Sequence, residues 1–209
     1  MQEFIDSKKV IEIRNIIDPK EIKSRAKEQS LINFNSAKIN IVSVGRLVNH
    51  KAFELAIGAI NNLISNGHNV HLYIVGEGVE RNFLENEIKR LKLTNHCTLL
   101  GFQNNPYPFI KKCDIYLQTS RIEGLGRTII EAALLCKPIV TTNFPTAFSI
   151  LQDNITGLIA EMNSQDISKS IERLIENKKL KNNLIENLRK KEDWEKEKTL
   201  DSIYKLLNS

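Results

Sequence analysis

Two glutamates, Glu123 and Glu131, have the type and spacing to bind a ligand that carries hydroxyl groups and a phosphate. Seven residues separate them, and the segment begins Gly124-Leu125-Gly126. We expect Glu123 on a flexible loop and Glu131 about one turn into a helix, with both side chains facing one crevice. A carboxylate near a helix start accepts ribose hydroxyls, while the free amides of 124–127 hold a phosphate. The plainer alternative is one exposed loop acid and one first-turn helix acid.

Two cations follow an earlier apolar run. Gly45 and Arg46 come directly after residues 39–44, and Lys51 lies immediately before the next expected helix. A glycine lets the backbone turn tightly, and a helix N-terminus beside Arg and Lys offers amides and positive charge to a diphosphate. Two solvated cations on a loop are the alternative. The glycine-rich turn at 75–78 lacks phosphate-loop spacing, so a structural role explains it better.

The elements that must position these residues alternate regularly along the chain. Apolar runs predict strands at 39–44, 71–76, 97–101, 114–118, 138–142 and 157–160, and amphipathic segments predict helices near 52–65, 79–92, 106–112, 127–136, 145–151 and from 164 onward. This order is typical of an α/β fold, a doubly wound Rossmann-like parallel sheet with helices on both faces. Ligands of such sheets bind beyond the carboxyl ends of the strands, where the residues above stand.

The composition is that of a folded protein with an ordinary core. Of 209 residues, 41% are hydrophobic and 26% charged, which excludes a disordered chain. A formal charge of +5 suits a phosphate-bearing ligand, an anionic membrane surface or nucleic acid. Mixed charges in the tail at 177–198 predict a solvated helix face, so we do not expect nucleic acid as a partner. No apolar stretch approaches the roughly 18 residues of a membrane span.

Neither the cysteines nor the histidines predict a metal site. Cys97, Cys113 and Cys136 lie in apolar surroundings without paired spacing, which indicates reduced core thiols in a cytoplasmic protein. The four histidines are scattered and show no nucleophile pattern. Phe102, Tyr107 and Phe109 could stack on a base, although core packing explains at least two of them better. We expect no metal and no cofactor.

Taken together, these motifs resemble the group 1 (family 4) glycosyltransferases. Their order and spacing carry the resemblance: GRL with Lys51 after the first strand, VGEG after the second, GF at 101–102, EGLGRTIIEAA at 123–133, KPIV at 137–140 and NITGLI at 154–159. Residues 15–18 look like the hinge before that family's second domain. The resemblance implies the C-terminal, donor-binding half of a GT-B enzyme. The division is then a lead-in and hinge at 1–38, the Rossmann-like domain at 39–190 and a crossing helix at 191–209.

The resemblance also implies roles for individual residues. Arg46 and Lys51 would bind the donor diphosphate, and Glu123 would meet the sugar hydroxyls. Glu131 would hold the ribose hydroxyls. Arg46, Lys51 and Glu123 would thus be catalytic, and the full donor-binding set would be Gly45, Arg46, Lys51, Gly101, Phe102, Gln103, Glu123, Gly124, Leu125, Gly126 and Glu131. Family members retain anomeric configuration without a metal, which fits cations placed at the diphosphate.

The sequence departs from the family pattern in two places. Ala52 stands where a glycine commonly follows the lysine, and Pro145-Thr146 replaces a double-glycine turn near the donor sugar. The identity of the sugar is therefore open, and UDP is favoured on family frequency alone.

The expected partners are a nucleotide-sugar donor and an N-terminal GT-B domain that has no counterpart in these 209 residues. The acceptor class is a polysaccharide, a lipid or a similar molecule, and the expected location is cytoplasmic, with peripheral membrane association left open. Two alternatives remain, a non-catalytic nucleotide-binding module and a basic nucleic-acid-binding module.

Overall fold

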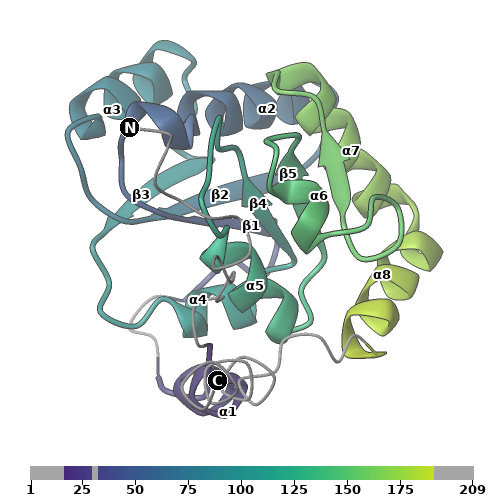
Figure 1. Ribbon diagram of the computed structural model, residues 1–209. Helices are drawn as coiled ribbons and strands as arrows, with labels where there is room; N and C mark the ends of the chain where they lie inside the picture. Colours follow the sequence, from purple (N-terminus) through teal and green to yellow (C-terminus); the bar gives the residue numbers. More distant parts are fainter. Residues whose placement is uncertain (1–16, 30–32, 191–209) are drawn as a thin grey trace, which may run out of the picture.

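The computed structural model describes residues 17–29 and 33–190. Its centre is a sheet of six parallel strands in the order β3-β2-β1-β4-β5-β6 (Figure 1). The strands are β1 (Ile39–Val44), β2 (Val70–Val75), β3 (Cys97–Gly101), β4 (Ile115–Gln118), β5 (Ile139–Thr142) and β6 (Leu158–Ala160). The predicted Rossmann-like parallel sheet is confirmed, and every predicted strand boundary lies within one residue of the observed one.

Helices connect the strands and extend the chain at both ends. They are α1 (Pro19–Arg25), α2 (Phe53–Ser65), α3 (Arg81–Arg90), α4 (Tyr107–Lys112), α5 (Arg127–Leu134), α6 (Ala147–Ile150), α7 (Ser164–Glu176) and α8 (Lys178–Lys190), with a short 3-10 turn, η2 (Asn49–Lys51), before α2. Asp18 caps α1, because its carboxylate accepts hydrogen bonds from the amides of Lys20 and Glu21. The predicted crossing helix at 191–209 and the first 16 residues of the predicted lead-in lie outside the described residues.

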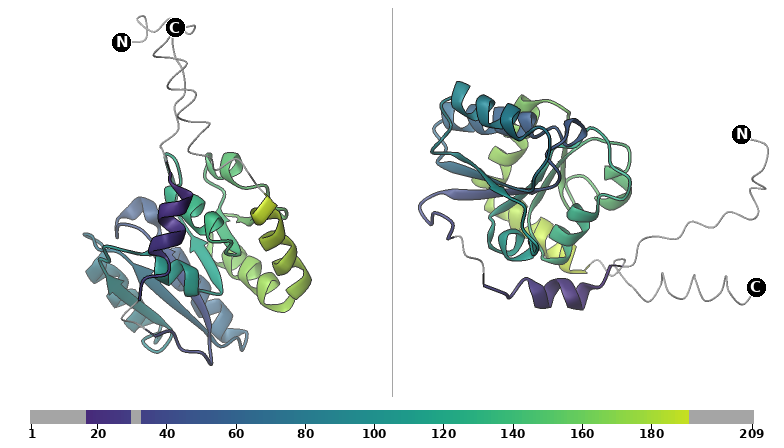
Figure 2. Two further views of the ribbon diagram at one scale, coloured as in Figure 1. Left: turned by 90° about the horizontal axis from the view of Figure 1, so that it is seen from below. Right: turned by 90° about the vertical axis from the view of Figure 1, so that its left-hand side faces the viewer.

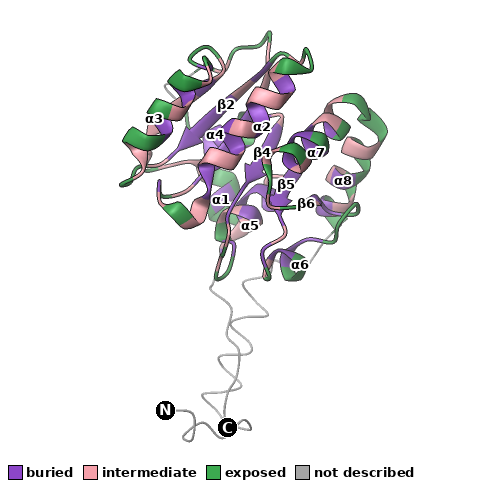
Figure 3. Cartoon of the chain, turned by 90° about the horizontal axis from the view of Figure 1, so that it is seen from above, coloured by how far each residue is buried: buried purple, intermediate pink, exposed green. Residues whose placement is uncertain are grey.

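The sheet separates two apolar clusters, as expected for a parallel sheet covered on both faces. On one face α2, α3 and α7 pack over the sheet, and on the other lie α4 and α5 with α1 outside them (Figures 1 and 2). The strands are mostly buried except for the edge strand β3, which is partly covered, and exposed residues lie on the outward sides of the helices and in the loops (Figure 3). No helix in the described ranges combines the length and hydrophobicity needed to cross a bilayer.

The direction of chain winding reverses between β1 and β4. These strands are neighbours in the sheet. From β1 the chain continues toward one edge of the sheet, through β2 and β3, and from β4 it continues toward the other edge, through β5 and β6. Ligand sites of doubly wound sheets lie at such a switch point, beyond the carboxyl ends of the strands. The segments that follow β1 and β4, residues 45–52 and 119–126, are those in which the sequence predicts phosphate and sugar contacts.

Candidate functional site

Lys51 and Glu123 meet across the switch point. The Lys51 ammonium forms an ion pair with Oε1 of Glu123, and both side chains are mostly buried, each with 13% exposure. Gln118 Nε2 also donates to Oε1, at 2.6 Å, as does the Ser120 hydroxyl. An ammonium has three donors, so Lys51 keeps N–H groups for a ligand while Glu123 holds it in place. The resemblance assigned both residues to the donor, Lys51 to its diphosphate and Glu123 to its sugar, but it did not predict this direct pairing.

The segment that carries Glu123 is fixed on both sides. On the side of β1, the Arg121 amide donates to the His50 carbonyl at 2.8 Å, and the Thr119 hydroxyl donates to the Lys51 carbonyl at 3.0 Å. On the side of β5, the Thr146 hydroxyl donates to the Glu123 carbonyl at 3.0 Å. Thr146 belongs to the pair that replaces the family's double glycine. The threonine at this position therefore adds a hydrogen bond that helps to hold the backbone of Glu123.

Gly126 begins α5 in a conformation that suits glycine. Its φ is +55°, and a Cβ built there would lie 2.5 Å from Cδ1 of Ile150. The helix has no side-chain cap, so its first amides are left for another partner. Gly124 and Leu125 are exposed, and a Cβ on Gly124 would meet no atom within 4 Å. The predicted phosphate-binding amides thus lie at an open, uncapped helix start.

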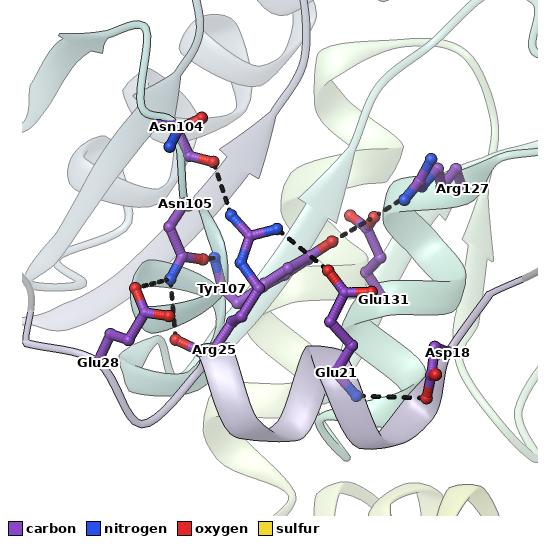
Figure 4. A network of polar contacts seen from close by, with 9 residues as sticks. All are labelled: Asp18, Glu21, Arg25, Glu28, Asn104, Asn105, Tyr107, Arg127 and Glu131. Atoms are coloured by element: carbon purple, nitrogen blue, oxygen red, sulfur yellow. Dashed lines mark hydrogen bonds and ion pairs between the residues drawn. The ribbon is translucent and has the colours of Figure 1, made fainter.

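Glu131 is buried on α5 and not an exposed helix acid, with only 4% of the residue accessible. Its Oε1 accepts hydrogen bonds from Tyr107 Oη at 3.2 Å and from Arg127 Nε at 3.0 Å (Figure 4). Burial raises the pKa of the carboxyl above its ordinary value, and the bonds from Arg127 and Tyr107 oppose that rise. A buried carboxylate with fixed donors is suited to accept hydroxyls from a ligand.

The loops after β1 and β2 pack backbone against backbone. The Leu47 amide donates to the Glu77 carbonyl at 2.9 Å, and Gly76 has a φ of +147°. A Cβ on Gly76 would lie 1.9 Å from the Gly45 carbonyl oxygen, which no other residue could tolerate. The structural interpretation of the VGEG turn is supported by this contact. Beside it Arg46 is exposed and forms no ion pair with any residue that the structure describes.

The corner after β3 presents one aromatic ring to solvent. Phe102 is 73% exposed, whereas Tyr107 and Phe109 are buried in the core, as expected for two of the three rings. Gly101 has a φ of +73°, and Gln103 Nε2 donates to the Leu100 carbonyl at 3.1 Å. Of the three aromatic candidates, Phe102 is thus available to stack on a planar ligand.

Ala52, the other departure from the family pattern, adopts the left-handed conformation with a φ of 49°. It joins η2 to α2, and it is completely buried. The position needs a positive φ, which explains why a glycine would suit it. Alanine keeps the same turn at a conformational cost of about 1 kcal/mol and leaves Lys51 in place.

The three cysteines are free, as the sequence predicted. Burial raises the pKa of Cys97 and of Cys113 to about 12, so both thiols are protonated at neutral pH. Cys136 differs from the expectation of a core thiol, because it is only partly buried. It occupies a left-handed turn, with a φ of 53°, that ends α5.

Two other features lie at the opposite, amino edge of the sheet. Ligand atoms of His68, Glu172 and Glu176 lie within 4.8 Å of one another, in a group that could hold a metal ion. A cavity of about 600 Å³ opens where β1 and β4 begin, and its lining includes Lys38, Asn40, Lys112, Asp114, Lys178 and Lys181. Neither feature includes a residue predicted to bind the donor.

Sequence reasoning missed the residues that hold the two glutamates. Gln118 and Ser120 fix Glu123, and Tyr107 and Arg127 fix Glu131. One signal was available, because a polar run at 118–120, at the end of an apolar strand, is unusual unless its side chains have specific partners. The roles assigned to the individual donor-binding residues remain predictions.

The fold and the paired loops at its switch point define a Rossmann-like domain with a candidate ligand site at the carboxyl edge of the sheet. The family described as glycosyl transferases group 1 matches residues 24–191. The chain belongs to this family. The predicted fold, one Rossmann-like half of a GT-B architecture, is thereby confirmed.

Known proteins resemble the chain over about half of their own length. An N-acetylgalactosaminyltransferase of Campylobacter jejuni that acts on a diphospho-undecaprenol-linked acceptor is 33% identical over 87% of this chain and 48% of its own. S. aureus TarM, solved with UDP, has a TM-score of 0.82 at 22% identity, covering 98% of this chain and 41% of TarM. Anabaena HepE, also solved with UDP, has a TM-score of 0.76 at 23% identity, covering 82% of this chain and 49% of HepE.

Proposed function

We propose that the chain is the nucleotide-sugar-binding domain of a retaining glycosyltransferase that works without a metal ion. It would transfer a hexose-type sugar to a polysaccharide, a lipid or a similar acceptor, in concert with an N-terminal acceptor-binding domain. The observation that carries the proposal is the arrangement of Lys51, Glu123 and Glu131 around the uncapped start of α5. UDP is the favoured nucleotide, supported by the UDP complexes of two proteins that share the fold.

Each part of the donor has a group suited to it. The first amides of α5, together with Arg46 and Lys51, offer positive charge and N–H donors to the diphosphate. The fixed carboxylate of Glu123 accepts hydroxyls of the sugar, and that of Glu131 accepts those of the ribose. Charge that develops on the leaving diphosphate would be stabilised by the same cations, which is the task a divalent ion performs in metal-dependent transferases.

Titration calorimetry with UDP and other nucleoside diphosphates, with and without a chelator, tests this proposal. We expect binding that the chelator leaves unchanged and an affinity that is modest, because the proposed N-terminal domain would supply the other side of the closed cleft. Strict dependence on Mg²⁺ or Mn²⁺ would contradict the metal-free mechanism.

Transfer is tested separately from binding. The chain alone should transfer no sugar at an appreciable rate, because transfer requires donor and acceptor to be held together. Adding the expected N-terminal domain in trans should restore transfer. Glycosylation of an acceptor by the 209-residue chain unaided would contradict the half-enzyme interpretation, and donor binding without transfer even with that domain would favour a non-catalytic module.

A further inference from the structure

Helix α1 packs against the outside of α4 and α5 through a set of polar contacts (Figures 2 and 4). Arg25 Nη2 donates to the Asn104 carbonyl at 3.0 Å. Asn105 Nδ2 donates in return to the Arg25 carbonyl at 2.9 Å and to Glu28 Oε2 at 2.8 Å. Ile22 and Ala26 are buried in the apolar cluster on the same side. Helix α1 is therefore attached at its C-terminal end to the turn that begins α4.

The Arg25 side chain lies against the ring of Tyr107. The guanidinium carbon is 5.3 Å from the ring centroid, which is within the range of a cation–π contact. Tyr107 is the first residue of α4, and only 6% of it is exposed. The ring is thus held between the core and Arg25. Figure 4 shows its hydroxyl directed at Glu131.

The hydroxyl of Tyr107 and the guanidinium of Arg127 both donate to the same oxygen of Glu131. The two distances to Oε1 are 3.2 and 3.0 Å. No donor in the described part of the chain reaches Oε2 of this carboxylate. Two donors on one oxygen fix the plane of the carboxylate and leave the other oxygen to accept a hydroxyl from a ligand.

We propose that Tyr107 is a positioning residue for the ribose-binding carboxylate and that Arg25 of α1 holds Tyr107 in place. This inference rests on the proposed function, because it takes Glu131 as the ribose contact. The contacts form one continuous path from α1 through Arg25 and Tyr107 to Glu131. A change in the position of α1 would therefore alter the affinity for the ribose and not the affinity for the diphosphate.

The test compares UDP with 2′,3′-dideoxy-UDP, which lacks the two ribose hydroxyls. Tyr107→Phe removes the hydroxyl and keeps the buried ring, so the core is conserved. We expect Tyr107→Phe to weaken UDP about fivefold in calorimetry, less than the tenfold or more of a direct hydrogen bond to a charged group. It should leave the affinity for dideoxy-UDP unchanged. A general structural defect would weaken both nucleotides, so the difference between them isolates positioning.

A second pair of variants tests the contribution of α1. Arg25→Ala should weaken the affinity for UDP about twofold to threefold and leave the affinity for dideoxy-UDP unchanged, because the ring of Tyr107 loses its cation–π contact with Arg25. Lys23→Ala is the matched control, since it removes one positive charge from an exposed position of the same helix. It should change neither affinity. Thermal unfolding of each variant verifies that the fold is retained.

The possible results separate the inference from the function on which it rests. Wild-type protein that binds no nucleoside diphosphate would overturn both. Equal binding of UDP and dideoxy-UDP by wild-type protein would show that Glu131 does not bind the ribose hydroxyls. That result would overturn the inference, while donor binding would stand. If wild-type protein prefers UDP but Tyr107→Phe keeps the full preference, a contact to the ribose hydroxyls stands and the positioning role of Tyr107 is wrong.

Discussion

Replacement of Gly126 by alanine should destabilise the domain by about 2 kcal/mol. The φ of +55° costs an alanine roughly 1 to 2 kcal/mol, part of which is offset because alanine also restricts the unfolded chain. The new Cβ would lie 2.5 Å from Cδ1 of Ile150, and overpacking of this kind adds roughly 1 kcal/mol, since the contact is with the end of a side chain. For a domain of this size, the melting temperature should fall by about 4 to 8 °C.

Urea and thermal unfolding of the wild type and four variants measure this effect and separate its two causes. Gly124→Ala is the control in the same loop, where a Cβ meets open space, and its stability should stay within about 0.5 kcal/mol of wild type. Ile150→Val removes Cδ1, so Gly126→Ala should cost only about 1 kcal/mol in that background. Equal losses from Gly124→Ala and Gly126→Ala, or an unchanged cost beside Ile150→Val, would refute the reasoning.

Three further predictions concern ligand contacts and protonation. Glu131→Ala should weaken nucleoside diphosphate binding, whereas Glu123→Ala should spare the nucleotide and weaken the intact nucleotide sugar, by about 1.5 to 3 kcal/mol per lost hydrogen bond in calorimetry; equal effects of both changes on both ligands would reject these roles. Burial lowers the pKa of His71 from 6.5 to about 4, so folding stability should fall by about 2 kcal/mol between pH 6.5 and 4, and His71→Gln should flatten that slope in urea unfolding. The pKa of Glu131 is raised, so wild-type stability relative to Glu131→Gln should decline from about pH 4.5 upward; a rising difference would contradict this.

Most of the strands could be predicted from the sequence because they are buried on both faces. Such strands form continuous apolar runs bounded by polar turns, as β1 and β2 do. The helices followed from their amphipathic spacing, and the order of elements then left few topologies. The two glutamates could be located because their spacing lies within one loop and one helix turn.

The partners of those glutamates could not be read from the sequence. Lys51 lies 72 residues before Glu123, and Tyr107 lies 24 residues before Glu131, so neither contact leaves a local pattern. Aromatic residues at a helix start are usually core residues, and Tyr107 is indeed buried. Its polar end is nonetheless the feature that matters for the site. Side-chain networks of this kind are set by packing between elements, which spacing along the chain does not encode.

The neighbourhood of β1 and β4 has a consequence for the order in which the molecule folds. Asn40 pairs with His71 of β2 only 31 residues later, but contacts between β1 and β4, such as Ser43 with Leu117, span 74 residues. Closing the longer loop costs about 0.8 kcal/mol more in chain entropy. During folding β1 can thus pair with β2, and β4 with β5, before these two halves of the sheet join. The ion pair of Lys51 with Glu123 joins the loops that follow β1 and β4. The candidate donor site therefore forms only when the two halves of the sheet have docked.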